Sequence, residues 1–280
     1  MSGAGEPDGR RRRRRAGFRA VGVLAAAAVA GLVVWYGWQA WSRDWRAADS
    51  GRATSSADAS GAHPFDRGER ASYRVTWRVG SEGGTEAGRA TFGAQPGTDV
   101  RHFTLDVETA GWLSNLYELR GRIESWAGAD LLPSRQEQHL SEGRRVTDQT
   151  IRFDRSAATF SVGDGRPLPL PQDARDGLSA WFYVRTLPLG AGYAALFPVV
   201  EGGRAYAVDV RVDRVERLQL GGRDVEAFRL ALCVNSASDR REVARAVAWL
   251  STDARRVPLA LDLQTSLGSF RVELDAYQRR

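Results

Sequence analysis

Apolar and polar residues alternate with a period of two over most of this chain, and this pattern constrains the fold more than any other feature. In residues 73–79, Tyr73, Val75 and Trp77 are separated by arginine or threonine, and residues 206–213 alternate in the same way. Successive side chains of a strand point to opposite faces, so each run predicts a strand with one apolar and one polar face. Such strands fit an antiparallel sheet and exclude a parallel sheet buried on both sides.

Glycine pairs mark the turns between these runs. The pairs at 202–203 and 221–222 supply the positive φ angles that tight hairpins require. Between Val212 and Val215 the apolar phase slips by one residue, which predicts a β-bulge or a corner in the sheet. The strands therefore follow one another as a meander, at spacings of roughly ten residues.

One segment departs from the alternation. The apolar residues of 173–187 recur at helical spacing, Asp176 or Asp173 is suited to cap the helix, and Pro188 ends it. The sequence therefore predicts a mainly β fold: a large curved antiparallel sheet, half-open barrel or sandwich of roughly a dozen strands. The one inserted helix is expected on its concave side.

A second helix is expected near the N-terminus, where six arginines, Arg10–Arg15, precede an uncharged stretch at 20–41. About twenty helical residues cross the roughly 30 Å hydrocarbon layer of a bilayer. Arginines resist translocation, so we expect a single span of the inner membrane, with the N-terminus cytoplasmic and the main domain periplasmic. The expected division is a cytoplasmic basic segment at 1–19, a transmembrane helix (signal anchor) at 20–41, a flexible linker at 42–62 and an exported β domain at 64–280.

A basic segment before an apolar run is also typical of a cleaved signal peptide. Trp35, Tyr36, Trp38 and Trp41 favour the anchor, because aromatic rings concentrate at the headgroup level where a retained helix leaves the bilayer. The alternative is cleavage after Ala30, which would leave the domain secreted or free in the periplasm.

The positive charge of the chain belongs to this N-terminal segment alone. Nine arginines and three acidic residues give residues 1–46 a net charge of +6, which equals the net charge of the whole chain. The remainder is neutral and lacks the basic surface that nucleic acids require. The expected partners are therefore the membrane and a lipid or an envelope protein, and not nucleic acid.

No catalytic, cofactor-binding or metal motif occurs in the sequence. His63, His102 and His139 have no second ligand at metal-binding spacing, and no nucleophile elbow, phosphate loop or zinc-protease motif is present. The single cysteine, Cys233, excludes an intramolecular disulfide. We therefore expect no enzymatic activity, no catalytic residue, no metal and no cofactor.

Tryptophans are suited to line an apolar cavity, although their commoner role is to fill a core. The apolar stretch at 111–117 is a candidate cavity loop, or else a hairpin connection that packs on the core. Arg185 follows the predicted helix and could pair with a buried acid, face the helix dipole or bind a ligand carboxylate. The candidate ligand-binding residues are Trp112, Leu113, Leu116, Trp181, Arg185 and Trp249.

Four blocks of sequence resemble a known family. They are residues 63–73 (HPFDRGERASY), 176–185 (DGLSAWFYVR), 217–230 (RLQLGGRDVEAFRL) and 248–258 (AWLSTDARRVP). In this order they are similar to a family of exported bacterial proteins known only as a domain of unknown function, found mostly in Gram-negative envelopes. The resemblance covers nearly all of residues 64–277 and implies an envelope location, but no activity. Members usually carry a cleaved signal, so the arginine-flanked anchor is a departure.

These observations favour a non-enzymatic envelope protein whose β domain faces the periplasm and binds an apolar ligand, such as a lipid, or an envelope partner. The first alternative is a structural or scaffolding module whose interior is filled by its own tryptophans. The second is a hydrolase of envelope polysaccharide, against which the missing motifs count.

Overall fold

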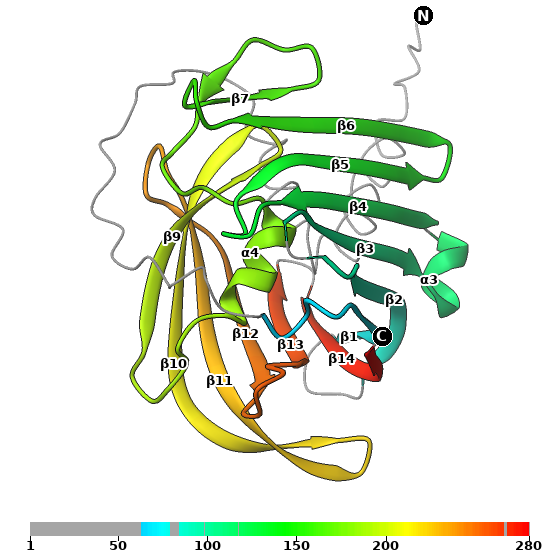
Figure 1. Ribbon diagram of the computed structural model, residues 1–280. Coiled ribbons are helices and arrows are strands. Elements are labelled where there is room, and N and C mark those ends of the chain that lie inside the picture. Colours follow the sequence, from blue (N-terminus) through cyan, green and yellow to red (C-terminus); the bar gives the residue numbers. More distant parts are fainter. Residues whose placement is uncertain (1–62, 79–83, 98, 117, 266–267, 280) are drawn as a thin grey trace, which may run out of the picture.

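The computed structural model describes residues 63–78, 84–97, 99–116, 118–265 and 268–279. Within them the chain forms fourteen strands of one antiparallel sheet and two helices (Figure 1). The strands are β1 (Glu69–Arg78), β2 (Thr85–Ala94), β3 (Arg101–Thr109), β4 (Leu119–Ala127), β5 (Pro133–Glu142), β6 (Arg145–Asp154), β7 (Thr159–Val162), β8 (Leu168–Pro169), β9 (Ala194–Glu201), β10 (Arg204–Leu220), β11 (Arg223–Ser236), β12 (Glu242–Ser251), β13 (Pro258–Thr265) and β14 (Gly268–Arg279). The helices are α3 (Gly111–Leu116) and α4 (Gly177–Val184).

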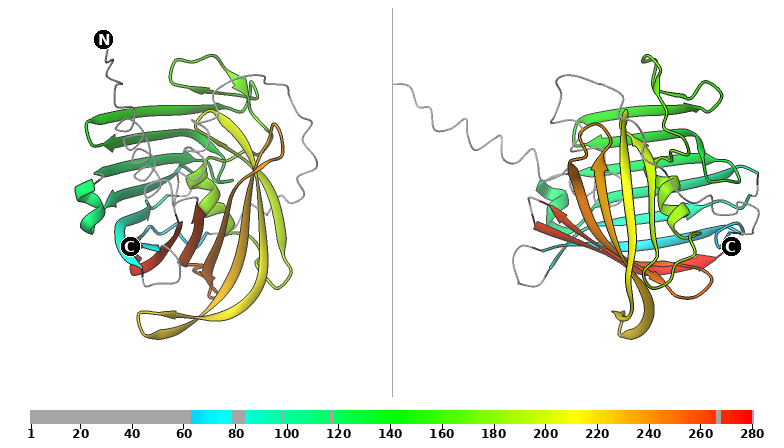
Figure 2. Two further views of the ribbon diagram at one scale, coloured as in Figure 1. Left: turned by 180° about the vertical axis from the view of Figure 1, so that it is seen from behind. Right: turned by 90° about the vertical axis from the view of Figure 1, so that its left-hand side faces the viewer.

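The sheet is a meander whose first and last strands pair with each other. The strand order is β8-β7-β6-β5-β4-β3-β2-β1-β14-β13-β12-β11-β10-β9, so β1 against β14 joins the two halves and β8 and β9 form the edges. The sheet curls around α4, which lies between the two halves (Figures 1 and 2). We call the face on the α4 side the inner face and the opposite one the outer face.

The segment between β8 and α4 connects the two edges of the curled sheet. Arg175 forms an isolated parallel bridge to β9, in which its N–H donates to Pro198 O at 3.1 Å and its carbonyl accepts from Val200 N at 2.7 Å. At the other end of the segment, Leu170 N donates to Ala158 O at 2.9 Å, in the turn after β6. The segment thus bridges two edges that do not pair directly.

The inner face carries the main hydrophobic core. Phe103 and Leu105 of β3, Val210 of β10 and Leu230 of β11 are buried in one cluster with Phe182 of α4. Alternate residues of each strand therefore point toward the helix, as the period-two pattern predicts. A smaller cluster lies beneath β6, β7 and the segment that bridges the edges.

A third cluster lies on the outer face, under the long hairpin of β10 and β11. The ladder shifts register between Val212 and Arg214, which confirms the bulge predicted from the phase slip. Beyond the bulge, Leu218, Leu220 and Val225 pack on a cluster of residues from β11, β12 and β13. The hairpin tip is thereby stabilised by apolar burial against strands of its own sheet.

The structure confirms a mainly β fold with a helix inserted against the concave side, and it corrects three details. The sheet has fourteen strands, the helix expected at 173–187 is confined to α4, and the expected loop at 111–117 contains α3. Asp176, not Asp173, caps α4. No helix among the described residues is long and apolar enough to cross a bilayer, and the span expected at 20–41 lies outside them, as do the segments at 1–19 and 42–62.

Candidate functional site on the inner face

Helix α4 is held in place by a capping box at its first turn. The Asp176 carboxylate accepts from Ser179 N at 2.7 Å, and Ser179 Oγ accepts from Asp176 N at 3.1 Å. Ser125 Oγ of β4 donates to the same carboxylate at 2.5 Å. The cap therefore ties the start of the helix to the sheet as well as satisfying its free N–H groups.

One side of α4 fills the inner face with aromatic rings. Phe182 stacks on Phe103 with ring centroids 4.0 Å apart, and Phe65 meets Phe182 edge-on at 5.0 Å. All three side chains are buried. This side of the helix is a packed core and leaves no room for a ligand.

The opposite wall of the inner face is less completely covered. Val208 of β10, Leu232 of β11 and Ala246 of β12 pack against the main core, yet each stays only partly buried. Leu232 faces Ala246 across the β11–β12 ladder, and Val210 faces Leu232 across the β10–β11 ladder. The three strands thus present a contiguous apolar surface that the described residues do not close.

Two buried polar atoms of side chains that pack on the main core have no hydrogen-bond partner among the described residues. Trp181 Nε1 of α4 and Tyr193 OH, just before β9, are buried and unbonded, and both side chains pack against the main core. Burial raises the pKa of Tyr193. Buried tryptophan and tyrosine polar atoms normally find hydrogen-bond partners, so a bound molecule could supply an acceptor to either of these two atoms.

A buried polar network lies where β5 approaches β9. The Glu201 carboxylate of β9 accepts from Gln136 Nε2 and Gly177 N, each at 3.0 Å, and from Gln138 Nε2. Burial, with the nearby Asp176 carboxylate as a smaller cause, raises the pKa of Glu201 to about 7. Burial also raises the pKa of Asp176, against the hydrogen bonds that favour its charged form. The network joins two parts of the sheet that are not adjacent in strand order.

Arg185, one of the residues predicted from the sequence, lies at the C-terminal end of α4 and is buried in an ion pair. Its guanidinium donates both Nη atoms to the Glu69 carboxylate, with Nη2 2.9 Å from Oε2. Arg185 Nε and Nη2 also donate to the carbonyls of Arg256 and Arg255, and Tyr277 OH donates to Glu69 at 2.9 Å. Of the three roles suggested for Arg185, the structure shows pairing with a buried acid.

Trp249 lies on the outer face, away from α4. Its Nε1 donates to Glu216 Oε1 at 2.7 Å, and the guanidinium groups of Arg229 and Arg271 lie over its ring at 5.9 and 4.7 Å. The neighbouring Leu250 belongs instead to the main core. Trp249 therefore holds the β10–β11 hairpin to the outer face and does not share a surface with Trp181.

The other sequence-predicted residues belong to α3. Leu113 is buried in the main core, so this turn is tucked against the sheet. Trp112 and Leu116 lie in the same helix, but their side chains are outside the described part of the structure. Of the six candidates, Trp181 packs against the main core on the inner face, with its ring 6.1 Å from that of Phe92 in β2.

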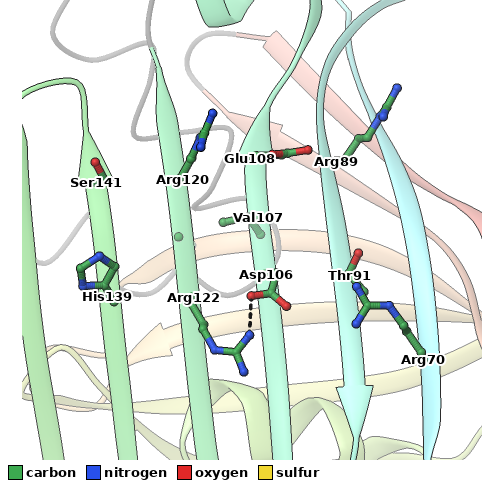
Figure 3. Close-up of a pocket in the computed structure, with 11 residues that line it drawn as sticks. Arg70, Arg89, Thr91, Asp106, Val107, Glu108, Arg120, Arg122, His139 and Ser141 are labelled. Atoms are coloured by element: carbon green, nitrogen blue, oxygen red, sulfur yellow. Dashed lines mark hydrogen bonds and ion pairs between the residues drawn. The ribbon is translucent and has the colours of Figure 1, made fainter.

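A shallow groove of about 500 Å³ lies on the outer face over β1 to β5 (Figure 3). Arg122 Nη1 is 2.9 Å from Asp106 Oδ1, while Arg89 and Arg120 project from the strands on either side of Glu108. Opposite charges on adjacent strands stabilise such a face against solvent. The groove has the character of a solvated sheet face.

The three histidines do not come together. His102 Nε2 is 2.9 Å from Glu124 Oε1 and His139 Nδ1 is 2.5 Å from Asp148 Oδ1, each on the outer side of its ladder, while His63 precedes β1. Within the described residues no three histidine, cysteine or acidic side chains are grouped in a way that could hold a metal ion.

Sequence reasoning did not identify Glu201, Arg175 or Tyr193. Glu201 ends an apolar run at 195–200, and nothing in that run signals that its carboxylate turns inward. Arg175 and Tyr193 lie in connections whose course depends on which strands form the sheet edges. A local pattern predicts strands but not which edges meet.

Comparisons with known proteins give a family and a fold. The family model described as "Protein of unknown function (DUF3108)" matches residues 72–275. A β-barrel-like protein of the domain of unknown function DUF1849 from Brucella abortus is similar in structure, with a TM-score of 0.56, 10% identity, and coverage of 77% of this chain and 99% of that one. A DUF1089 family protein from Pseudomonas aeruginosa matches with a TM-score of 0.35 and 14% identity over 65% of this chain and 90% of that one, too weakly to inform the fold. No curated protein matches the chain.

Proposed function

We propose a ligand-binding role without catalysis for this chain, which belongs to the family described as "Protein of unknown function (DUF3108)". The ligand is an apolar molecule, such as a lipid, that lies on the inner face beside α4. One observation carries the proposal: the contiguous apolar wall of Val208, Leu232 and Ala246 remains partly exposed inside a curled sheet. Small-ligand sites in proteins are lined mainly by apolar side chains with few polar groups, and this wall has that character.

The buried acids support a role without catalysis. Asp176 and Glu201 are the carboxylates at the start of α4, and both are closed off from solvent. Their hydrogen-bond partners are protein groups that position the helix and β9. A general acid or base must reach its substrate within hydrogen-bond distance, which this burial prevents.

We further propose that the β domain faces the periplasm, on a single inner-membrane span at residues 20–41. The six arginines before that stretch and the aromatic residues after it support this orientation. N-terminal sequencing of the membrane-associated protein tests it. A chain that retains its arginine block agrees with the proposal, and a mature start just after Ala30 would overturn it in favour of the secreted form.

A variant with a bulkier side chain on the apolar wall tests ligand binding directly. Residues 63–280 are produced without detergent, their β-rich fold is checked by circular dichroism, and N-phenylnaphthylamine is titrated as a neutral apolar probe. We expect Ala246→Trp to weaken probe binding by about tenfold or more, because the larger ring occupies the apolar wall. Ala231→Trp is the matched control, since Ala231 neighbours Leu232 on the outer side of β11.

The same titration separates the proposal from its alternative. If Ala246→Trp and Ala231→Trp bind the probe equally strongly, the probe binds elsewhere and the proposal is overturned. If the folded parent domain does not bind the probe, the scaffolding role is favoured, in which the aromatic core around Phe182 fills the interior.

A further inference from the structure

Three arginines are buried in the described part of the chain, and they differ in their partners. Arg101, Arg175 and Arg185 expose 4, 7 and 2% of their surface. Arg101 Nε is 2.9 Å from Asp66 Oδ1, and Arg185 pairs with Glu69. Arg175 has no carboxylate at ion-pair distance among the described residues. The fold therefore supplies a counter-ion for two of its buried guanidinium groups and not for the third.

The contacts of Arg175 leave part of its guanidinium unbonded. Its Nη1 donates to Asp173 O at 3.0 Å, and its guanidinium carbon lies 3.4 Å from the ring centroid of Tyr183. Its Nε is buried without a hydrogen-bond partner. The tyrosine ring stabilises the cation from one side but accepts no hydrogen bond from Nε.

A second arginine with an unbonded Nε, the half-buried Arg155, lies close by. Arg155 Nη2 donates to the carbonyls of Pro133 and Ala174, at 3.2 and 2.6 Å, and its Nε is also buried and unbonded. Burial lowers the pKa of both arginines. Nearby acids partly offset this effect on each of them, and the charge of Arg155 further lowers the pKa of Arg175. The carboxylates of Asp130 and Asp173 attract both cations without forming an ion pair with them.

A buried cation such as Arg175, with the half-buried Arg155 beside it and no bonded anion, is costly to maintain. Removing a charge from water is unfavourable unless hydrogen bonds and a counter-ion replace the hydration shell. Guanidinium groups bind carboxylate and phosphate oxygens through paired N–H donors, and two guanidiniums match the charge of a phosphate group best. The unbonded Nε atoms are the donors that such a group would use.

We propose that Arg175, with Arg155 beside it, binds an oxyanion, and that the oxyanion is the phosphate group of an amphiphile whose apolar part lies on the inner face. This inference rests on the proposed function for the apolar part. The two regions are continuous through Tyr183, which meets Phe197 edge-on at 5.2 Å, because Phe197 pairs with Val208 of the apolar wall. The ligand is thus a phosphate monoester or diester with an alkyl chain.

Native mass spectrometry of the full chain, released from neutral detergent, tests the assignment. The probes are dodecyl phosphate, dodecanol and inorganic phosphate, each titrated against the parent and three variants. We expect the parent to bind dodecyl phosphate about tenfold more tightly than dodecanol. Arg175→Gln should lose this preference, Arg155→Gln should reduce it, and Arg70→Gln should retain it. Arg70 is the matched control, because it is an exposed arginine of β1 on the outer face (Figure 3).

The outcomes distinguish this inference from the proposed function. If dodecyl phosphate and dodecanol bind the parent equally, or if neither Arg175→Gln nor Arg155→Gln changes the preference, the inference is wrong and the apolar site stands. If neither alkyl probe binds, the proposed function fails. If inorganic phosphate binds in a way that depends on Arg175 and dodecanol does not bind, the anion site is supported, but the proposal that the anion belongs to an amphiphile is overturned. Thermal melts of all variants establish that each is folded, and Arg155→Gln keeps the test valid if Arg175→Gln is not.

Discussion

Glu69 and Arg185 form an ion pair between the first strand and the end of α4. The pair is removed from water, and its remaining donors and acceptors are satisfied by Tyr277 and by the carbonyls of Arg255 and Arg256. These contacts join β1 and β14 to the helix through one carboxylate. Burial, with the Glu69 charge as a smaller cause, raises the pKa of Tyr277 to about 12, above its ordinary value of 10.

Removing one member of this pair should be strongly destabilising. Glu69→Gln leaves the Arg185 cation buried without its counter-ion, and we expect the free energy of unfolding to fall by about 3 to 5 kcal/mol. Urea denaturation measures this loss. Asp275→Asn is the matched control, because it breaks the exposed pair with Arg74 and should cost less than about 1 kcal/mol. Equal effects of the two substitutions would contradict the account.

Glu201 gives the protein a pH dependence of unusual sign for a carboxylate. Its pKa is about 7 in the folded state against an ordinary value of 4.5, so the folded state holds the proton more tightly than the unfolded chain. The contribution of Glu201 to the free energy of unfolding should therefore be fully present below about pH 4.5 and fall by up to about 3 kcal/mol as pH rises through 7. Urea denaturation of the parent and of Glu201→Gln, at about pH 5 and about pH 8, measures this contribution as a difference.

We expect Glu201→Gln to flatten the pH dependence across that window, because glutamine does not ionise. Glu108→Gln, which removes an exposed carboxylate of the outer face, should leave the dependence as in the parent. Parallel pH profiles for the parent and Glu201→Gln would show that Glu201 is ionised throughout the window in the folded state.

Single residues were predictable from the sequence where their role is local. Asp176 was expected to cap a helix, and it does so, because a cap depends on residues three positions apart. The pairing of Arg185 with Glu69 spans more than a hundred residues, so only a buried acid of unknown identity could be predicted as its partner. Which acid it would be depends on β1 lying beside β14.

At the scale of elements, the β10–β11 hairpin shows what alternation can and cannot predict. The phase slip after Val212 correctly placed the bulge. Trp249, by contrast, was expected among the candidate ligand-binding residues, and it lies under the bent hairpin on the outer face. Period-two patterns establish that neighbouring residues face opposite ways but not which face the hairpin will cover.

Trp249→Ala should therefore loosen the hairpin without affecting ligand binding. The substitution removes a buried ring, its hydrogen bond to Glu216 and its contacts with two guanidinium groups. We expect the free energy of unfolding to fall by about 3 kcal/mol, as for other buried tryptophans. Affinity for N-phenylnaphthylamine should stay within about twofold of the parent. A loss of affinity as large as that of Ala246→Trp would move the site to the outer face.

Helices were predicted less well than strands. Helix α4 has a capping box and a following proline, and its existence was correctly predicted, although it is shorter than the expected 173–187. Helix α3 has six residues and no acidic residue in its first turn. So short an element has too few turns for a helical period to appear in the sequence, and its position depends on burying Leu113 against the sheet.

At the scale of the whole molecule, the first and last strands of the chain pair in the middle of the sheet, and the two edges of the sheet stay open. Pairing of β1 with β14 joins the ends of the meander, while the bridge at Arg175 holds β9 to the segment after β8 and the network at Glu201 holds β9 to β5. An antiparallel meander of many strands was predictable from alternation and turn glycines. The approach of the edges was not, because it depends on backbone contacts of the segment between β8 and α4 and on side chains of β5 and β9, which are far apart in the sequence.

The central claim is that the inner face beside α4 binds an apolar molecule, and mass spectrometry of material extracted from the purified domain tests it most directly. Residues 63–280, produced in bacteria and purified without detergent, should yield an amphiphile in near-stoichiometric amount. The same domain with Ala246→Trp should yield much less of it, while Ala231→Trp yields the parent amount. A folded domain from which no apolar compound can be extracted, and to which none can be added back, would contradict the account.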